Sequence, residues 1–316
     1  MNVPARGTAG GKVILLGEHA VVYGRPALVA GVPRRLTVTI TAGDGPRVDS
    51  PVAADDQRPV QLLVAVARHF GLAPEGLVAR VDSELPAGAG FGSSAALVVA
   101  MVRAMALAAG QSMEVPALLR LGRELEAMFH GVSSGVDPAA AALGGCFWYA
   151  LDPQGRVDAN ARQTEAPFFG AVALGGTIEV VVARHVGSRR TGLAVGGVRE
   201  RWQADRPRFE RLFDAVDAVV RSGVAAVRCG DRHALGARFD ENHRVLMEMG
   251  VSSPATDALV TTARGAGALG AKLTGGGAGG AIIALVTAAA PVVDALRAAG
   301  ATTDVVRLDP VTTPVA

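Results

Sequence analysis

The sequence predicts an α+β fold with two domains. Segments typical of strands and helices follow one another without strict alternation, which favours an α+β arrangement over a regular βα repeat. The 316 residues exceed the ~100–200 residues of a single domain. Half of them are hydrophobic, enough for a substantial core. We expect a boundary near residue 175, which gives domains 1–175 and 176–316.

The elements follow from hydrophobic periodicity and from helix-terminating residues. Residues 12–16 are rich in Val, Ile and Leu and predict a buried strand. Residues 93–109 are apolar on nearly every side, so this helix is expected to be central. The segment 116–130 is amphipathic and opens at Pro116. Further strands are expected at 36–40, 77–83, 172–183, 281–286 and 305–308, and further helices at 60–70, 208–221, 234–249, 254–264 and 291–299.

Composition excludes several classes of protein. The net charge is +2 with scattered basic residues, and aromatic content is 4%, so neither a nucleic acid nor a membrane is expected as a partner. No signal peptide and no run of ~18 apolar residues is evident. The two cysteines, Cys146 and Cys229, are far apart, which fits no disulfide framework or zinc site and agrees with a reducing cytoplasm. A homodimer is compatible with the sequence.

Lysine is scarce in this chain. Of the 31 basic residues, only Lys12 and Lys272 are lysines. Lysine is a compact point charge that approaches a single oxygen and shifts its pKa readily, unlike arginine. A chain that otherwise uses arginine therefore marks these two positions as candidate site residues, although chance would also explain so small a sample.

A glycine-rich loop before the central helix predicts a phosphate site. Gly88, Gly90 and Gly92 alternate along the loop, and Ser93 and Ser94 follow at the helix start. Free backbone amides and the positive end of a helix dipole attract phosphate. The alternative is a plain loop with a serine cap. The expected ATP-binding residues are Pro86, Ala87, Gly88, Ala89, Gly90, Phe91, Gly92, Ser93, Ser94 and Ala95.

Three other segments carry groups suited to catalysis. Glu18 and His19 follow a predicted strand at Gly17 and are otherwise surface turn residues. Glu126 lies on a predicted helix that runs into a Ser-Gly turn and Asp137. These two carboxylates would serve a metal and a substrate hydroxyl, or else be a solvated charge and a helix cap.

The last of these segments is rich in glycine and begins at Lys272. Thr274 is followed by Gly275, Gly276 and Gly277, which would permit close approach to a ligand or another loop. The alternative is a flexible turn before the next strand.

These segments, in this order, resemble the motifs of the galactokinase–homoserine kinase–mevalonate kinase (GHMP kinase) family. Residues 12–24 read Lys-Val-Ile-Leu-Leu-Gly-Glu-His-Ala-Val-Val-Tyr-Gly, which is similar to the mevalonate kinase version of the first motif. Ser134-Gly135-Val136-Asp137 resembles the turn that carries the base. The resemblance covers most of the chain. It implies an N-terminal domain like ribosomal protein S5 domain 2 and a C-terminal ferredoxin-like α/β sandwich.

The resemblance also implies a reaction, phosphorylation of the C5 hydroxyl of mevalonate with ATP and Mg²⁺. It implies Asp137 as the base and Lys12 as its partner. The implied metal ligands are Ser94 and Glu126; the implied substrate contacts are Lys12, Glu18, His19, Arg189 and Thr191; and the implied support loop contains Thr274, Gly275, Gly276 and Gly277. Because mevalonate carries a carboxylate, Arg189 and His19 are the candidate cations that would face it.

Several alternatives stay open at this point. A related enzyme would act on phosphomevalonate, a sugar or another alcohol, or would decarboxylate its substrate, and a non-catalytic protein would only bind ATP and a ligand. The chain also departs from the family pattern. Phe91 stands where leucine is usual, and Val132-Ser133 replaces a frequent Asn-Pro.

Overall fold

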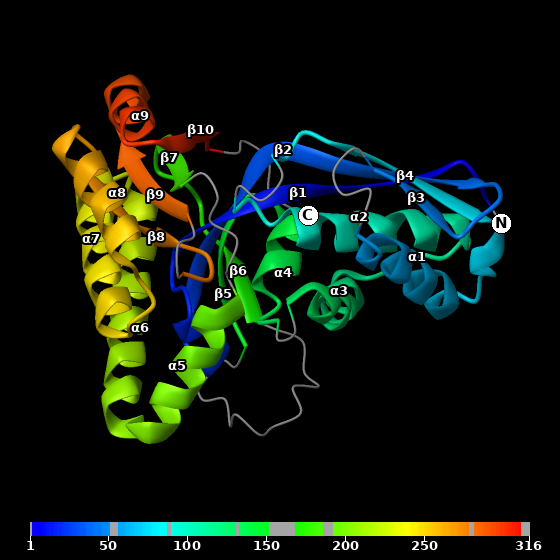
Figure 1. The fold of residues 1–316 in the computed structure, drawn as a ribbon, viewed down its shortest axis with the longest axis horizontal. Helices are drawn as coiled ribbons and strands as arrows, with labels where there is room; N and C mark the ends of the chain where they lie inside the picture. Colours follow the sequence, from blue (N-terminus) through cyan, green and yellow to red (C-terminus); the bar gives the residue numbers. More distant parts are fainter. Residues whose placement is uncertain are drawn as a thin grey trace. The chain divides into compact units, whose positions relative to one another are not determined.

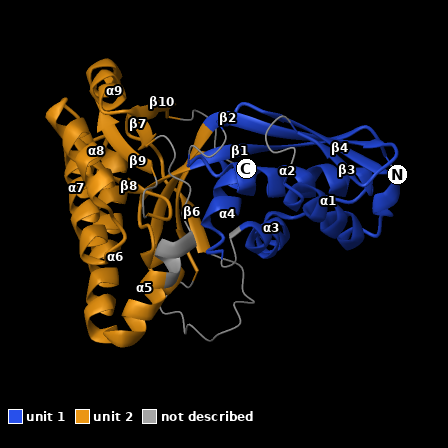
Figure 2. Ribbon diagram, viewed as in Figure 1, with its two compact units in different colours: residues 1–12, 33–144, 165–167 blue, residues 13–32, 145–164, 168–316 orange. Residues whose placement is uncertain are grey.

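The computed structural model describes residues 2–50, 56–86, 90–130, 133–151, 168–185, 192–277 and 281–310. It divides into two compact units, shown in different colours in Figure 2. Within the described residues, unit 1 holds 2–12 and 33–144, and unit 2 holds 13–32, 145–151 and 168–310. Each unit is therefore built from separate stretches of chain. The domain boundary near residue 175 stays a prediction.

Unit 1 contains a sheet and a group of helices (Figure 1). Strand β4 pairs in parallel with β3 and antiparallel with β2, and β1 also pairs with β2. Strands β1 and β2 each continue into unit 2, where the start of β2 pairs with β5. The elements are β1 (Ala5–Leu16), β2 (Ala27–Ala42), β3 (Arg47–Asp49), α1 (Arg58–His69), the 3-10 turn η2 (Pro74–Gly76), β4 (Leu77–Ser83), α2 (Ser93–Ala108), α3 (Val115–His130) and α4 (Val136–Leu143).

Helix α2 is the centre of unit 1, as its all-round apolar sequence predicted. It packs against α1, α3 and α4, and most of its side chains are fully buried. Its single charge, Arg103, donates to the carbonyls of Thr8 (2.7 Å) and Ala142 (2.8 Å). Hydrogen bonds of this kind make a buried guanidinium tolerable. Arg103 thereby joins the helix to β1 and to the end of α4.

Unit 2 contains a four-stranded antiparallel sheet in the order β10-β7-β9-β8. Strand β9 is wholly buried, and helices α8 and α9 pack on the sheet over an aliphatic core. The elements are the 3-10 turn η1 (Ala20–Tyr23), β5 (Cys146–Ala150), β6 (Phe168–Ala171), β7 (Ile178–His185), α5 (Gly192–Ala204), α6 (Arg206–Cys229), α7 (Arg232–Glu248), α8 (Pro254–Gly265), β8 (Gly270–Thr274), β9 (Ala281–Val286), α9 (Ala289–Ala298) and β10 (Ala301–Leu308).

The sequence located most elements but misplaced some of their limits. The strand expected at 172–183 was expected to be interrupted at Gly175 and Gly176. The interruption is confirmed, but the strand begins only at Ile178, because β6 ends at Ala171 and residues 172–177 belong to no strand. Between them, a Cβ on Gly175 would lie 2.3 Å from the carbonyl oxygen of Arg228, so the chain passes very close to the end of α6. No helix in the described part of the chain is both long and apolar enough to cross a membrane.

Candidate active site

The first group of predicted residues meets in unit 1 at Lys12. Lys12 lies on β1, and Asp137 lies in the first turn of α4, which begins after Gly135 in a left-handed conformation (φ +81°). The Lys12 Nζ atom is 3.1 Å from Asp137 Oδ1, with side chains 5% and 27% exposed respectively. The ammonium is thus buried, while the carboxylate retains access to a ligand. The two residues that the sequence paired are in direct contact.

Glu126 adds a second carboxylate to this group. It is buried on α3, and burial, followed by the nearby charge of Asp137, raises the pKa of Glu126 to about 8. A hydrogen bond from Ser133 and the charge of Lys12 act in the opposite direction. At pH 7 the carboxyl group therefore holds a proton in the ligand-free protein. A neighbouring cation would favour its ionised form.

Ser133 is a site residue that the sequence did not identify. Its hydroxyl donates to the Glu126 carboxylate and accepts the N–H of Gly135 at 3.0 Å. It therefore links the α3 carboxylate to the turn that precedes Asp137. The only signal in the sequence is the Val132-Ser133 pair, which departs from the family pattern.

The end of the glycine-rich loop packs on Lys12. The backbone N–H of Lys12 donates to the carbonyl of Phe91 at 3.0 Å. Gly92 has φ +67°, and a Cβ there would lie 3.0 Å from both Cγ and Cε of Lys12. Glycine is required at this position for its backbone conformation and for the close approach of the lysine stem. The loop residue thereby fixes the direction of the ammonium.

Helix α2 begins directly after this glycine. Ser93 and Ser94 occupy its first turn and are half-buried, and Ala95 is buried. The first amides of a helix lack intrahelical partners, so this end of α2 suits an anion. Of the other residues expected in the loop, Pro86 and Gly90 are described, whereas Ala87, Gly88 and Ala89 lie outside the described residues.

Phe91 faces the interior of unit 1. Its side chain is 1% exposed, and the guanidinium of Arg34 stacks over its ring at 5.5 Å. The larger side chain at this position is therefore accommodated by the core of the unit.

The second group of predicted residues lies in unit 2, at a turn formed by residues 17–19, which we call the 17–19 turn. Gly17 has φ +105°, and a Cβ there would lie 2.5 Å from Cα of Ala27. Glu18 and His19 are both buried. The Glu18 carboxylate forms an ion pair with Lys272 of β8, and both side chains are almost completely inaccessible. Both lysines singled out by their scarcity thus make buried ion pairs with carboxylates.

The His19 imidazole is buried in the ligand-free protein. Burial first, and then the charges of Arg201 and Lys272, lower the pKa of His19 to about 4. The ligand-free imidazole is therefore neutral at pH 7, whereas a carboxylate bound beside it would favour the charged form. The role of His19 as a cation that faces a substrate carboxylate stays a prediction.

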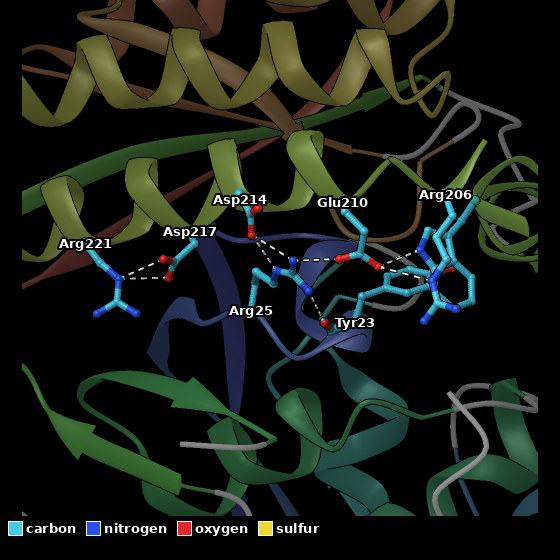
Figure 3. Close-up of polar contacts among 8 residues, drawn as sticks. Tyr23, Arg25, Arg206, Glu210, Asp214, Asp217 and Arg221 are labelled. Atoms are coloured by element: carbon cyan, nitrogen blue, oxygen red, sulfur yellow. Dashed lines mark hydrogen bonds and ion pairs between the residues drawn. The ribbon is translucent and has the colours of Figure 1, made fainter. Parts of the chain in front are cut away.

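The chain that leaves the 17–19 turn is anchored on α6 (Figure 3). The Arg25 guanidinium donates to Glu210 and Asp214, both at 2.7 Å, and to the carbonyl of Tyr23 at 3.0 Å. The Tyr23 ring stacks on Phe213 with centroids 4.3 Å apart. Charged hydrogen bonds and stacking together hold η1 against this helix.

The predicted support loop also lies in unit 2. Thr274 donates through its hydroxyl to the carbonyl of Ile14 at 3.2 Å. Gly275 and Gly277 both have φ +79°, and a Cβ on Gly277 would lie 2.4 Å from the carbonyl oxygen of Val251. Gly276 between them is half-buried. The glycines therefore allow a tight turn, while Arg189 and Thr191 lie outside the described residues.

Comparison with known proteins identifies the family. Residues 58–145 match the GHMP kinases N terminal domain, and residues 215–302 match the GHMP kinases C terminal domain. This chain belongs to the GHMP kinase family. Kinases of this family take the phosphoryl group from ATP, which accords with the phosphate site expected at the start of α2 in this GHMP kinase.

Individual relatives agree with the family assignment. The chain is 35% identical over 273 residues to a mevalonate kinase of Methanothermobacter thermautotrophicus, covering 84% of this chain and 85% of that protein. It is 33% identical over 293 residues to a mevalonate kinase of Aeropyrum pernix, covering 87% and 86%. A crystal structure of L. major mevalonate kinase in complex with R-mevalonate has a TM-score of 0.82 and 27% identity, covering 98% of this chain and 97% of that chain.

The raised pKa of Glu126 predicts a gain of stability on its neutralisation. The unfolded carboxyl ionises near 4.5 and the folded one near 8, so its contribution to stability falls as pH rises through that window. We expect Glu126→Gln to raise the free energy of unfolding of the ligand-free kinase at pH 8 by roughly 1–3 kcal/mol. Near pH 4 the gain should vanish.

Denaturant unfolding at both pH values measures this effect. Glu124→Gln is the matched control, since Glu124 is exposed on the same helix and should unfold like the wild type. A Glu126→Gln protein less stable than wild type at pH 8 would show that the ionised carboxylate is well paired without ligand.

The lowered pKa of His19 predicts that the folded protein loses stability in acid. Because its folded pKa lies near 4 and its unfolded value near 6.5, the unfolded chain binds the proton first and stability falls as pH drops between these values. Replacing the imidazole by His19→Gln should remove up to about 3 kcal/mol of that fall. His243, whose pKa is also lowered by burial, should account for a residual slope.

Urea unfolding from pH 7 to pH 4 tests this contribution. Exposed His233 on α7 provides the control His233→Gln, which should follow the wild-type curve. Equal slopes for wild type and His19→Gln would mean that the imidazole protonates inside the fold at no cost.

Proposed function

We propose that this GHMP kinase transfers the γ-phosphoryl group of ATP to the C5 hydroxyl of mevalonate. The observation that carries the proposal is the 3.1 Å contact between Lys12 and Asp137, next to the start of α2, where we expect the phosphates of ATP to bind. The choice of mevalonate is supported by the first motif and by relatives that are mevalonate kinases. A sensor that only binds ligands would have no need of this buried pair.

The proposed chemistry follows from the charges of this pair. An alcohol becomes a good nucleophile as its proton leaves, and Asp137 is placed to accept that proton. Lys12, 3.1 Å from that carboxylate, would lower the pKa of a substrate hydroxyl bound beside it. Phosphoryl transfer otherwise depends on positioning and charge neutralisation. The close approach of Gly92 holds Lys12 in the required direction.

We further propose that Ser94 and Glu126 hold Mg²⁺ bound to the phosphates of ATP. The fit is supported by the donor set, a buried carboxyl group on Glu126 close enough to Asp137 for the charge of Asp137 to raise its pKa. The described residues contain no group of three or more His, Cys, Asp or Glu side chains suited to a metal. Mg²⁺ characteristically uses one or two carboxylates and completes its shell with phosphate oxygens and water. When bound, it would neutralise phosphate charge.

The substrate contacts are proposals of the same kind. Glu18, His19, Arg189 and Thr191 are proposed to contact mevalonate, with Lys12 beside the accepting hydroxyl. Arg189 and His19 are the candidates to face the carboxylate of mevalonate, and a guanidinium can bind a carboxylate through two hydrogen bonds. The free cysteines among the described residues, Cys146 and Cys229, agree with a cytoplasmic enzyme. A homodimer is also a prediction.

The substrate is tested directly with a panel of alcohols. Purified protein with ATP and Mg²⁺ should release ADP with the highest kcat/KM on mevalonate, compared with phosphomevalonate, galactose and homoserine. Carbon dioxide should not be produced. Faster turnover of another alcohol would replace the proposed substrate, and ATP-dependent release of carbon dioxide would indicate a decarboxylase.

The pair itself is tested by two substitutions. Asp137→Asn should lower kcat by at least ~10²–10⁴-fold, as for the loss of a general base, while ATP affinity stays within two-fold. Lys12→Arg keeps the charge but not the compact ammonium, and it should also fall well below wild-type activity. Steady-state kinetics and nucleotide titration measure both effects. An Asp137→Asn enzyme within a few-fold of wild type would exclude Asp137 as the base.

A further inference from the structure

Unsatisfied polar atoms gather at the 17–19 turn. Among the described residues, the buried side-chain atoms without a hydrogen-bond partner are Oε2 of Glu18, Nε2 of His19 and Nδ2 of Asn242. Asn242 belongs to the same cluster, because its Oδ1 accepts the N–H of Gly17 at 3.1 Å. Buried polar groups normally have partners, since an unsatisfied one is costly. Their concentration at one turn points to a polar ligand that supplies the missing contacts.

The backbone of this turn is strained. His19 has φ +62° and ψ −51° and is the one non-glycine residue with positive φ in the part of the chain described. Gly17, two residues earlier in the same turn, also has a positive φ. A side-chain-bearing residue keeps such a conformation only where its surroundings impose it, and such residues concentrate at functional sites.

Two side chains from later in the sequence contact the turn. Lys272 on β8 is fully buried and donates both to the Glu18 carboxylate and to the carbonyl of Leu273 (2.7 Å). Asn242 on α7 holds Gly17. Helix α7 and strand β8 pack against each other, and the Leu273 N–H donates to His243 at 3.3 Å. Asn242 and Lys272 thus lie on two elements, α7 and β8, that pack against each other.

The anchor in Figure 3 acts on another part of the segment. Arg25 and Tyr23 fix the chain after the turn to α6, whereas Lys272 and Asn242 contact the turn itself. Lys272 also bonds Glu18 directly before the strained His19. Loss of the Lys272–Glu18 ion pair would leave a buried carboxylate unpaired, and the turn would have to open to hydrate it.

We propose that Lys272 is a positioning residue for substrate binding: together with Asn242, it holds the 17–19 turn so that the imidazole of His19 is presented to the substrate. This inference rests on the proposed function for the identity of that substrate as mevalonate. The conformation of the turn can nevertheless be measured without any ligand. The two parts can therefore fail separately.

The experiment compares Lys272→Met and Asn242→Ala with wild type and with Asp240→Asn. Asp240 provides a matched control, because it pairs with Arg264 and accepts the N–H of Ala271 at the same α7–β8 contact. Steady-state kinetics give KM for mevalonate and for ATP. Nitrogen-15 NMR of the ligand-free protein, with His19→Gln for assignment, follows the His19 ring, on which the charges of Arg201 and Lys272 act.

Both variants should raise the mevalonate KM at least tenfold and leave the ATP KM within two-fold of wild type. Removal of the Lys272 charge raises the His19 pKa in Lys272→Met by itself, so Asn242→Ala is the variant whose His19 ring reports on the turn. In Asn242→Ala the ring should titrate closer to 6.5, as an exposed imidazole does, while Asp240→Asn leaves the KM values and the ring unchanged. If Lys272→Met does not fold, the mevalonate KM and the His19 titration of Asn242→Ala test the proposal alone. Unchanged His19 signals and mevalonate KM, with only a lower melting temperature, would overturn the proposal.

The outcome for the wild type separates the two claims. A wild-type protein that leaves mevalonate untouched would remove the proposed substrate, and the NMR titration would still decide whether Lys272 and Asn242 hold the turn. A His19 ring that titrates identically in all four proteins would refute the positioning role even if mevalonate is phosphorylated.

Discussion

The chemistry of unit 1 depends on an imbalance of buried charge. One ammonium, Lys12, serves two nearby carboxyl groups, Asp137 and Glu126, and only Asp137 contacts it directly. Burying a second carboxylate beside the first is unfavourable, so Glu126 takes up a proton in the ligand-free protein. A neighbouring cation would favour the ionised form of Glu126. The same imbalance lowers the stability of the ligand-free protein as pH rises towards 8.

Close backbone contacts determine where these charges point. Gly92 brings the loop against the stem of Lys12, and Ser133 ties Glu126 to the turn before Asp137. In unit 2, Gly17 has a positive φ and allows a tight turn that places the Glu18 carboxylate against Lys272. A glycine beside each buried ion pair permits an approach that a larger residue would block. The local backbone geometry therefore determines where the charges of both ion pairs lie.

The sequence predicted the chemical groups better than their environments. Lys12 and Asp137 could be paired because their motifs and residue types identify them, and the structure places them in contact. Ser133 was missed because a serine before a Ser-Gly turn reads as an ordinary turn residue. The low pKa of His19 in the ligand-free protein could not be predicted, because it depends on burial and on the charges of residues far along the chain, Arg201 and Lys272. Helix α5 was missed because its glycine-containing sequence shows no clear apolar face.

The distribution of lysine and arginine follows from the same physics. Arginine serves partly exposed ion pairs such as that of Arg25, where a planar fork can bond two carboxylates at once. Lys12 and Lys272 are instead 4% and 0% exposed, and each pairs with a carboxylate. Backbone lies close to both, at Gly92 for Lys12 and at the carbonyl of Leu273 for Lys272. A guanidinium has five donors to satisfy, whereas an ammonium has three and needs less room. The scarcity of lysine was informative because these two buried pairs require a compact cation that the other 29 basic residues, all arginine, do not provide.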